Sequence, residues 1–390
     1  MNKRKWIVLG LIVVGVLLFV ILRPPPIVGK PRIGVILSTT GQYDLIGKPE
    51  RDVLEALMKD YKAHDHVDPG VELVFSDSGG QLEQATKIFN DFAKDPSIKA
   101  IIGPSTSGES IPLAALAESK QIPLLSLAAS RKIVVDDKEN TRKWVFKFAQ
   151  NDDLAARRVL QAMEANQHRS VALLYSDDGF GKSGGGQFLN VLKQAGIKPV
   201  FSSSFPSELT EPDPVIAGIP GDVKAVVIWG TAPGPALLVR ALRRKNQHAQ
   251  IYLSHGDASV DFLESAGPAA EGVIIVGSRV LLDRKYLNSN DPSDVVILSY
   301  QDFWTHHGFR GAPSHFGGHA RDAIEALILI MAKGQNERAD IRAQLETLDS
   351  FHGVTGTFRF NEKDHAGLDI QAFATYRVEQ GAFVPFEAHK

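Results

Sequence analysis

The stretch that decides the fold is residues 99–110, KAIIGPSTSGES. Its apolar run at 100–102 is typical of a buried strand in a parallel sheet. The run continues into small hydroxyl residues, including Thr106 and Ser107, and a helix is expected to begin near residues 109–112. Open α/β sheets bind ligands at the carboxyl ends of their strands. These hydroxyls therefore either hold a polar ligand group or merely cap the helix. The architecture of the rest of the chain distinguishes between these two roles.

Length and composition set the first limits. The chain has 390 residues, which is long enough for two or three domains. Its 43 Lys and Arg nearly balance its 45 Asp and Glu, so no strong field attracts a polyanion, and no nucleic-acid partner is expected. The absence of cysteine excludes disulfides, thiolate metal ligands and a cysteine nucleophile.

The amino terminus carries a candidate membrane segment. Lys3, Arg4 and Lys5 precede an apolar run over residues 6–22, and a proline-rich stretch follows it. The run reaches the lower limit for crossing a membrane, and no small-residue cleavage site follows, so we expect an uncleaved signal anchor rather than a cleaved signal peptide. Residues 1–31 are thus predicted to be an anchor and spacer, with the rest of the chain in the periplasm, on the outer side of the cytoplasmic membrane.

From residue 32 onward, short apolar runs alternate with amphipathic stretches. Strands are expected near 33–37, 71–75, 100–102, 123–127 and 144–148, and in a second series near 171–175, 199–205, 225–229, 250–253 and 272–276. Strands that alternate with helices predict parallel, doubly wound sheets. The expected fold is therefore α/β, with two such lobes. A cleft between lobes is a favoured ligand site.

Two connecting segments have weaker patterns. Residues 181–183, GKS, lack the glycine that a phosphate-binding loop needs five positions before Gly181, where Ser176 stands. They are expected to form a glycine-rich turn before a helix near 187–194. At the carboxyl end, the alternating residues 356–360 and 371–378 predict an antiparallel pair.

Several segments match a known family in their order and spacing. They are IGV at 33–35, TG at 40–41, VEL at 71–73, IIGP at 101–104, IP to AAS from 122 to 130, YSDD to FG from 175 to 181, EGV at 271–273 and GVTGTFRF at 353–360. Together they resemble the type I periplasmic binding proteins, in the leucine/isoleucine/valine-binding branch that serves ABC importers. The resemblance implies crossings between lobes near Phe148, Gly277 and Gly353. Lobe I would then comprise residues 32–148 and 278–352, and lobe II residues 149–277 and 353–390.

The resemblance also implies a ligand site. In that family, a first-lobe serine corresponding to Ser107 and a segment corresponding to residues 128–130 hold the carboxylate of the ligand. Wall positions corresponding to Ile46 and Phe180 would pack against its apolar part. The full set of expected ligand-binding residues is Ile46, Thr106, Ser107, Ala128, Ala129, Ser130, Phe180, Thr231 and Asp257.

The chain departs from the amino-acid binders at the position for the ammonium group of the ligand. Where they carry an acidic residue, this chain has Gly256, flanked by His255 and Asp257. An unpaired ammonium in a closed cleft is costly, so either Asp257 substitutes or the ligand lacks an ammonium group. A commonly aromatic position is Arg321 here. A less typical amino acid, a carboxylate and an amide all remain open.

Catalytic and metal-binding patterns are weak. His315 and His319 have helical spacing, but Phe316 stands where the zinc-protease motif needs glutamate. Ser107 lacks the leading glycine of a Gly-x-Ser-x-Gly elbow. The sequence therefore predicts no enzyme, no cofactor and no bound metal. Tyr43 and Trp229 are candidates for either the cleft wall or the core.

The leading hypothesis is an extracytoplasmic solute-binding protein whose lobes close on a small polar ligand and present it to an ABC importer. The alternative is a membrane-tethered receptor or regulator of the same fold, which senses a ligand or binds a protein partner without transport. A cleft filled by side chains would favour this alternative.

Overall fold

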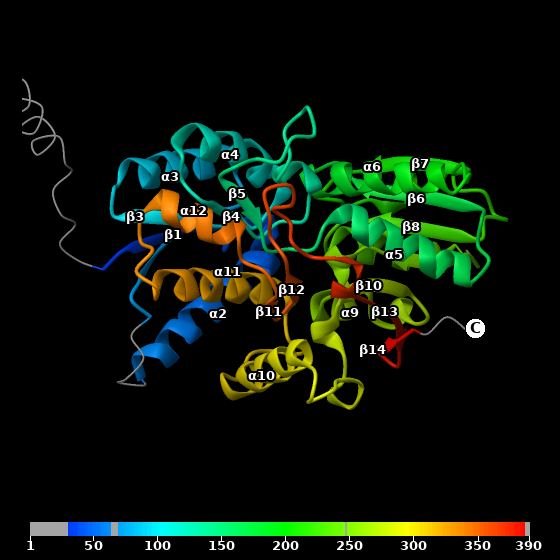
Figure 1. Ribbon diagram of the computed structural model, residues 1–390. Coiled ribbons are helices and arrows are strands. Elements are labelled where there is room, and N and C mark those ends of the chain that lie inside the picture. Colours follow the sequence, from blue (N-terminus) through cyan, green and yellow to red (C-terminus); the bar gives the residue numbers. More distant parts are fainter. Residues whose placement is uncertain (1–29, 64–68, 246–247, 387–390) are drawn as a thin grey trace, which may run out of the picture.

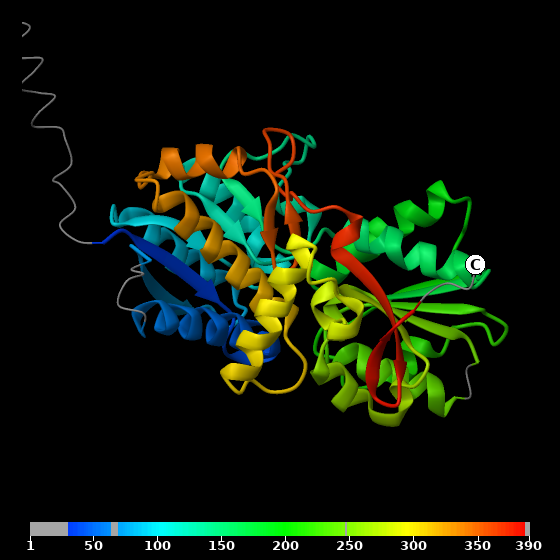
Figure 2. The ribbon, with the colours of Figure 1, turned by 60° about the horizontal axis from the view of Figure 1, so that its bottom comes forward.

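The computed structural model describes residues 30–63, 69–245 and 248–386. The expected anchor at residues 6–22 lies outside this part of the chain. Within the described ranges, no helix combines the length and the apolar character needed to cross a membrane. The described residues form two α/β lobes that lie side by side, as Figures 1 and 2 show.

The first lobe is built on a five-stranded sheet in which all neighbouring strands are parallel. In spatial order, its strands are β2 (Glu72–Asp77), β1 (Arg32–Leu37), β3 (Ile98–Ile102), β4 (Leu124–Ser126) and β5 (Val145–Lys147). Every residue of β3 is buried, as the apolar run at 100–102 predicts. The 144–148 segment contributes the edge strand β5, after which the chain leaves this sheet.

Helices cover both faces of the first sheet. Successive residues of a strand point to opposite faces, so β1 contributes Val35 to one core and Ile36 to the other. The core around Val35 is completed by α2 (Asp44–Ala63), α11 (His315–Met331) and α12 (Arg338–Glu346). The core around Ile36 is completed by α3 (Leu82–Lys94) and α4 (Ser107–Lys120). A smaller cluster seats α10 (Pro292–His306) against α2.

The second lobe has a seven-stranded sheet. In spatial order, its strands are β14 (Ala382–Pro385), β13 (Phe373–Glu379), β10 (Ile274–Ser278), β9 (Gln250–Leu253), β8 (Ala225–Trp229), β6 (Val171–Ser176) and β7 (Phe201–Phe205). The pairs are parallel from β7 to β10, and β13 and β14 add antiparallel strands. One face is covered by α5 (Asp152–Ala165) and α6 (Gly179–Gln194). The other is covered by α7 (Pro212–Ile216), α8 (Gly234–Arg244) and α9 (Val260–Ala266).

The chain changes sheets after β5, after β10 and before β13. The third crossing lies later than Gly353, because a hairpin of β11 (Phe351–Gly353) and β12 (Gly356–Phe358) packs Phe358 into the first-lobe core. The predicted pairing of 356–360 with 371–378 is wrong. Instead, β13 pairs with β10 and β14, since its Tyr376 and Val378 complete the second-lobe core. We therefore propose the lobe boundaries given above with one change: residues 353–372 belong to lobe I.

Two helices begin earlier than the sequence predicted. The helix α4 begins at Ser107, with Thr106 as its N-cap. The helix α6 begins at Gly179, so residues 181–183 lie in its first turns and do not form a separate glycine-rich turn. Asp178 caps this helix by accepting the Gly181 backbone N–H at 2.7 Å. This cap offsets the poor helix propensity of the glycines that follow.

Candidate functional site

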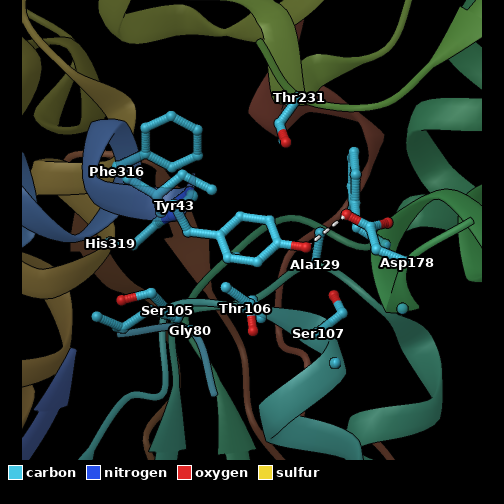
Figure 3. A pocket seen from close by; sticks show the side chains of 18 of the residues that line it. Tyr43, Gly80, Ser105, Thr106, Ser107, Ala129, Asp178, Thr231, Phe316 and His319 are labelled. Atoms are coloured by element: carbon cyan, nitrogen blue, oxygen red, sulfur yellow. Dashed lines mark hydrogen bonds between the residues drawn. The ribbon is translucent and has the colours of Figure 1, made fainter. Parts of the chain in front are cut away.

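A cavity lies between the two lobes, and Figure 3 shows the side chains that line it. It encloses about 630 Å³, including the open space at its mouth. The first lobe contributes residues that follow each of its five strands, together with the start of α11. The second lobe contributes the start of α6 and the loops after β8 and β9. The sequence-predicted residues that line it are Ile46, Thr106, Ser107, Ala128, Ala129, Phe180 and Thr231.

Two expected ligand contacts lie outside the lining. The hydroxyl oxygen of Ser130 lies 2.6 Å from that of Ser183, which in turn donates to Asp152. Asp257 is fully buried, and this burial raises the pKa of its carboxyl well above the ordinary value. Its neighbours His255 and Gly256 line the cavity in its place. Ser130 thus joins the lobes, and Asp257 lies behind the cavity wall.

The hydroxyl loop before α4 is largely occupied by the protein itself. Ser105 accepts the Ser38 backbone N–H at 3.0 Å and is hydrogen-bonded to the Glu50 carboxyl. Thr106 accepts the Glu109 backbone N–H at 3.3 Å and donates to the Glu109 carboxylate at 2.7 Å. Both hydroxyls therefore have a donor and an acceptor already.

Ser107 differs from its two neighbours. Its oxygen accepts the Ser130 backbone N–H at 3.3 Å, and within the described ranges its hydroxyl hydrogen has no acceptor. Ser107 is buried and lines the cavity. It is therefore the hydroxyl of this loop that is free to donate to a ligand.

Tyr43, which the sequence left as a candidate for either the cleft wall or the core, lies in the cavity wall. Its ring lies across the cavity, and its hydroxyl donates to the Asp178 carboxylate at 3.1 Å (Figure 3). Burial and the adjacent Asp178 raise the pKa of this phenol. Trp229, in contrast, belongs to the core: it is fully buried, and its ring centroid lies 6.1 Å from that of Phe180 and 6.0 Å from that of His255.

Three buried histidines line the cavity and were not predicted to do so: His255, His315 and His319. Burial lowers the pKa of His255 to about 3 and of His315 to about 4, and it lowers the pKa of His319 well below the ordinary value. All three imidazoles are neutral at pH 7. His255 follows β9 and the other two lie on α11, so only the closed arrangement of the lobes brings them together.

The histidines do not form a metal site. In the part of the chain that the structure covers, no group of three or more His, Cys, Asp or Glu side chains could hold a metal ion. His319 instead places Nε2 3.0 Å from the Gln150 side-chain oxygen, to which it can donate as a neutral ring. The i,i+4 spacing of His315 and His319 thus reflects their shared face of α11.

The first turns of α4 and α6 approach closely across the cavity floor. A Cβ added to Gly179 would lie 2.6 Å from the Gly108 backbone nitrogen. Only glycine at position 179 permits this approach. The lobes therefore meet through backbone at this point as well as through Tyr43 and Ser130.

Comparisons with known proteins agree on the family. A family model for periplasmic binding proteins matches residues 30–382. The Leu/Ile/Val-binding protein homolog 2 of Brucella abortus is 22% identical over 361 residues, which cover 91% of this chain and 93% of the relative. An extracellular ligand-binding receptor from Rhodopseudomonas palustris superposes with a TM-score of 0.82 at 22% identity, covering 92% of this chain and all of that one. A leucine binding protein, LivK, from Thermotoga maritima superposes with a TM-score of 0.76 at 20% identity. The match covers 91% of this chain and 97% of that one. The resemblance found in the sequence is confirmed, and the chain belongs to the periplasmic binding protein family.

Proposed function

We propose that this chain is an extracytoplasmic solute-binding protein that captures a small polar ligand between its lobes and presents it to an ABC importer. The observation that carries the proposal is the cavity itself, whose lining comes from both lobes. A ligand that contacts both linings stabilises the closed arrangement over any open one, because only the closed form offers both sets of contacts.

Closure also creates contacts between protein groups. The Tyr43–Asp178 and Ser130–Ser183 hydrogen bonds each join one lobe to the other. Both depend on the lobes being together. The surface formed by two closed lobes would then report to the importer that a ligand is bound. This mechanism requires no chemical step, so we propose no enzymatic activity and no cofactor.

The ligand class follows from the lining and from the relatives. Two of the proteins named above are Leu/Ile/Val- and leucine-binding proteins, and this cavity combines aromatic and aliphatic walls with a few polar groups. An amino-acid-like molecule, a small carboxylate or an amide therefore fits the proposed function. The apolar run at residues 6–22 would hold the protein at the outer face of the cytoplasmic membrane.

One observation favours the alternative function. The ring of Tyr43 lies across the cavity and is hydrogen-bonded on the far side (Figure 3). A cleft that a side chain of the protein partly occupies in this way suits a membrane-tethered receptor or regulator. Such a protein binds a protein partner without transporting a solute.

A thermal-shift screen of the full chain in mild detergent tests the proposal. The panel contains amino acids, small carboxylates and amides, and small-angle scattering on any hit measures the radius of gyration with and without ligand. At a hundred-fold excess over its dissociation constant, a ligand stabilises the folded state by about 2.7 kcal/mol. A hit that also makes the molecule more compact supports solute capture. A well-folded protein that responds to no compound of the panel favours the receptor or regulator.

A further inference from the structure

We propose that the ligand of the interlobe cavity is an uncharged polar molecule of the primary-amide type, with an apolar body. This inference rests on the proposed function and narrows its ligand class. It ranks such a ligand above both the free carboxylate and the zwitterionic amino acid.

The cavity offers no cation to a carboxylate. Within the described part of the chain, no lysine or arginine lines it. Lys147 lies behind the wall, fully buried, and its charge contributes to the low pKa of His255 and His319. Its ammonium group is turned to the Ala129 carbonyl, at 2.7 Å, and to the Asn151 side chain. A ligand carboxylate would therefore be buried without a direct ionic partner, which is unfavourable.

Two of the helix N-termini at the cavity, those of α4 and α6, do not replace that cation, because each is already matched by a carboxylate of the protein. In the first turn of α4, the carboxylate of Glu109 accepts hydrogen bonds from the hydroxyls of Thr106 and Ser38, at 2.7 and 3.0 Å. At the start of α6, Asp178 accepts the Gly181 backbone N–H. Negative charge at these ends offsets the partial positive charge of each helix.

An ammonium group would also have few partners. Among the described residues, Asp178 is the one carboxylate in the lining, and it already accepts hydrogen bonds from Tyr43, Ser176 and Gly181. Asp257, the residue that could have replaced the missing acid, lies outside the lining. An ammonium group would therefore have to compete with these three donors for Asp178.

Neutral hydrogen-bonding groups, in contrast, are available. The two ring nitrogens of His255 and the Nδ1 atom of His319 are buried and have no hydrogen-bond partner among the described residues. A neutral imidazole donates from one nitrogen and accepts at the other. Buried polar groups are nearly always paired, so a bound ligand is the natural partner for these atoms.

A primary amide fits this set of groups. It has an acceptor oxygen and two donor hydrogens, and it carries no charge. Ser107 donates to such an oxygen, and a neutral imidazole can serve either end of the amide. Phe180, Phe316 and Ile46 supply the apolar walls for the body of the ligand.

Two matched series test this inference with the full chain. The first contains 4-methylpentanamide, 4-methylpentanoate, 3-methylbutylammonium and leucine, and the second contains benzamide, benzoate and benzylammonium. Affinity is measured by calorimetry, and the tryptophan fluorescence gives a second readout, because Trp229 contacts Phe180 and His255. We expect the amide of at least one series to bind ten-fold or more tightly than each of its charged counterparts.

Three outcomes overturn the inference. A carboxylate or leucine that equals or exceeds the amide shows that the cavity accepts charge. A loss of leucine binding in Asp178→Asn shows that this carboxylate holds the ammonium group of an amino acid. Silence in both series shows that the amide class is wrong. In each case the proposed function is tested separately. It is supported if a compound of the wider screen binds and makes the molecule more compact.

Variants locate the bound amide. His255→Phe keeps a ring of similar size but removes both nitrogens, and we expect it to lower amide affinity about ten-fold. His306→Phe, at an exposed position of α10, is the matched control and should leave the affinity unchanged. Equal affinities of the two variants would remove His255 from the site. Circular dichroism and thermal unfolding without ligand check that both variants fold.

Discussion

Tyr43 donates its phenolic hydrogen to the Oδ2 atom of Asp178, 3.1 Å away, and so joins the loop before α2 to the N-cap of α6. This bond connects the two lobes directly across the cavity. Replacing Tyr43 by phenylalanine keeps the ring and removes the bond. Because hydrogen bonds to charged groups contribute about 1.5–3 kcal/mol, we expect Tyr43→Phe to speed dissociation of 4-methylpentanamide about ten-fold. Stopped-flow fluorescence measures this rate, and Tyr286→Phe, at a tyrosine 48% exposed, is the control. An unchanged rate in Tyr43→Phe would show that this bond does not hold the closed form.

Ser107 is the second test of the site. Among the hydroxyls of Ser105, Thr106 and Ser107 at the start of α4, that of Ser107 is the one whose hydrogen lacks an acceptor among the described residues. We expect Ser107→Ala to weaken binding of 4-methylpentanamide about three- to ten-fold, the usual effect of losing one neutral hydrogen bond. Ser119→Ala, on an exposed turn of the same helix, should have no effect. Calorimetry on both variants decides, and equal affinities would place the ligand away from this loop.

A pair of glycines in α6 tests the packing behind the site. A Cβ added to Gly184 would overlap the indole of Trp229, whereas a Cβ added to Gly186 would meet no atom within 4 Å. We expect Gly184→Ala to lower the free energy of unfolding by about 1–3 kcal/mol, through overpacking. Gly186→Ala should raise it by roughly 0.5–1 kcal/mol, because alanine is the better helix former. Urea titrations measure both. Similar midpoints for the two variants would show that Trp229 can move aside at little cost.

The parallel sheets could be predicted because most of their strands contain a short apolar run. The run at β3 is buried on both faces of the first sheet, so its composition depends little on the register of its neighbours. The start of α6 could not be predicted in this way. Its glycines have poor helix propensity, and the contacts that require two of them, Gly179 with Gly108 and Gly184 with Trp229, are seen only in the tertiary structure.

The candidate site, too, could be predicted only in part. Ser107 and Thr106 could be placed because the carboxyl end of a parallel strand is a general ligand position. His255 and His319 are 64 positions apart in the sequence and come from different lobes, so no local pattern could bring them together. Asp257 was a reasonable candidate from its type alone. Its burial behind Gly256 depends on the short helix of residues 255–257, which sequence spacing does not fix.

The carboxylate of Asp322 on α11 links stability to pH. It is fully buried and accepts the backbone N–H groups of Val354 and Thr355 at 2.6 and 2.9 Å. Burial raises the pKa of this carboxyl from 3.8 to about 7, although these hydrogen bonds act in the opposite direction. Between these two values, the folded state binds more protons than the unfolded state. The contribution of Asp322 to stability is therefore full below about pH 4 and is lost as the pH rises through 7, by at most on the order of 4 kcal/mol.

Asp322→Asn isolates this effect. The variant cannot titrate at this position, while groups such as His255 contribute equally to both proteins. We expect the free energy of unfolding of the wild type, measured relative to Asp322→Asn, to fall as the pH rises from 4 to 7 and to level off above it. Urea titrations at half-unit pH steps measure the difference. Parallel pH profiles would mean that the hydrogen bonds from the hairpin keep Asp322 ionised throughout.

Gly179 provides a test of closure that leaves each lobe intact. Its backbone meets that of Gly108 from the other lobe, and an added Cβ would lie 2.6 Å from the Gly108 nitrogen. Because backbone atoms cannot turn aside as a side chain can, Gly179→Ala should hold the lobes apart. We expect binding of 4-methylpentanamide to weaken by ten-fold or more and its addition to cause no compaction in small-angle scattering. Gly186→Ala, in the same helix but away from the interface, should bind and compact like the wild type. If Gly179→Ala closed normally, the contact between α4 and α6 would not be needed for capture, and the ligand would have to be held by the Tyr43 side of the cavity.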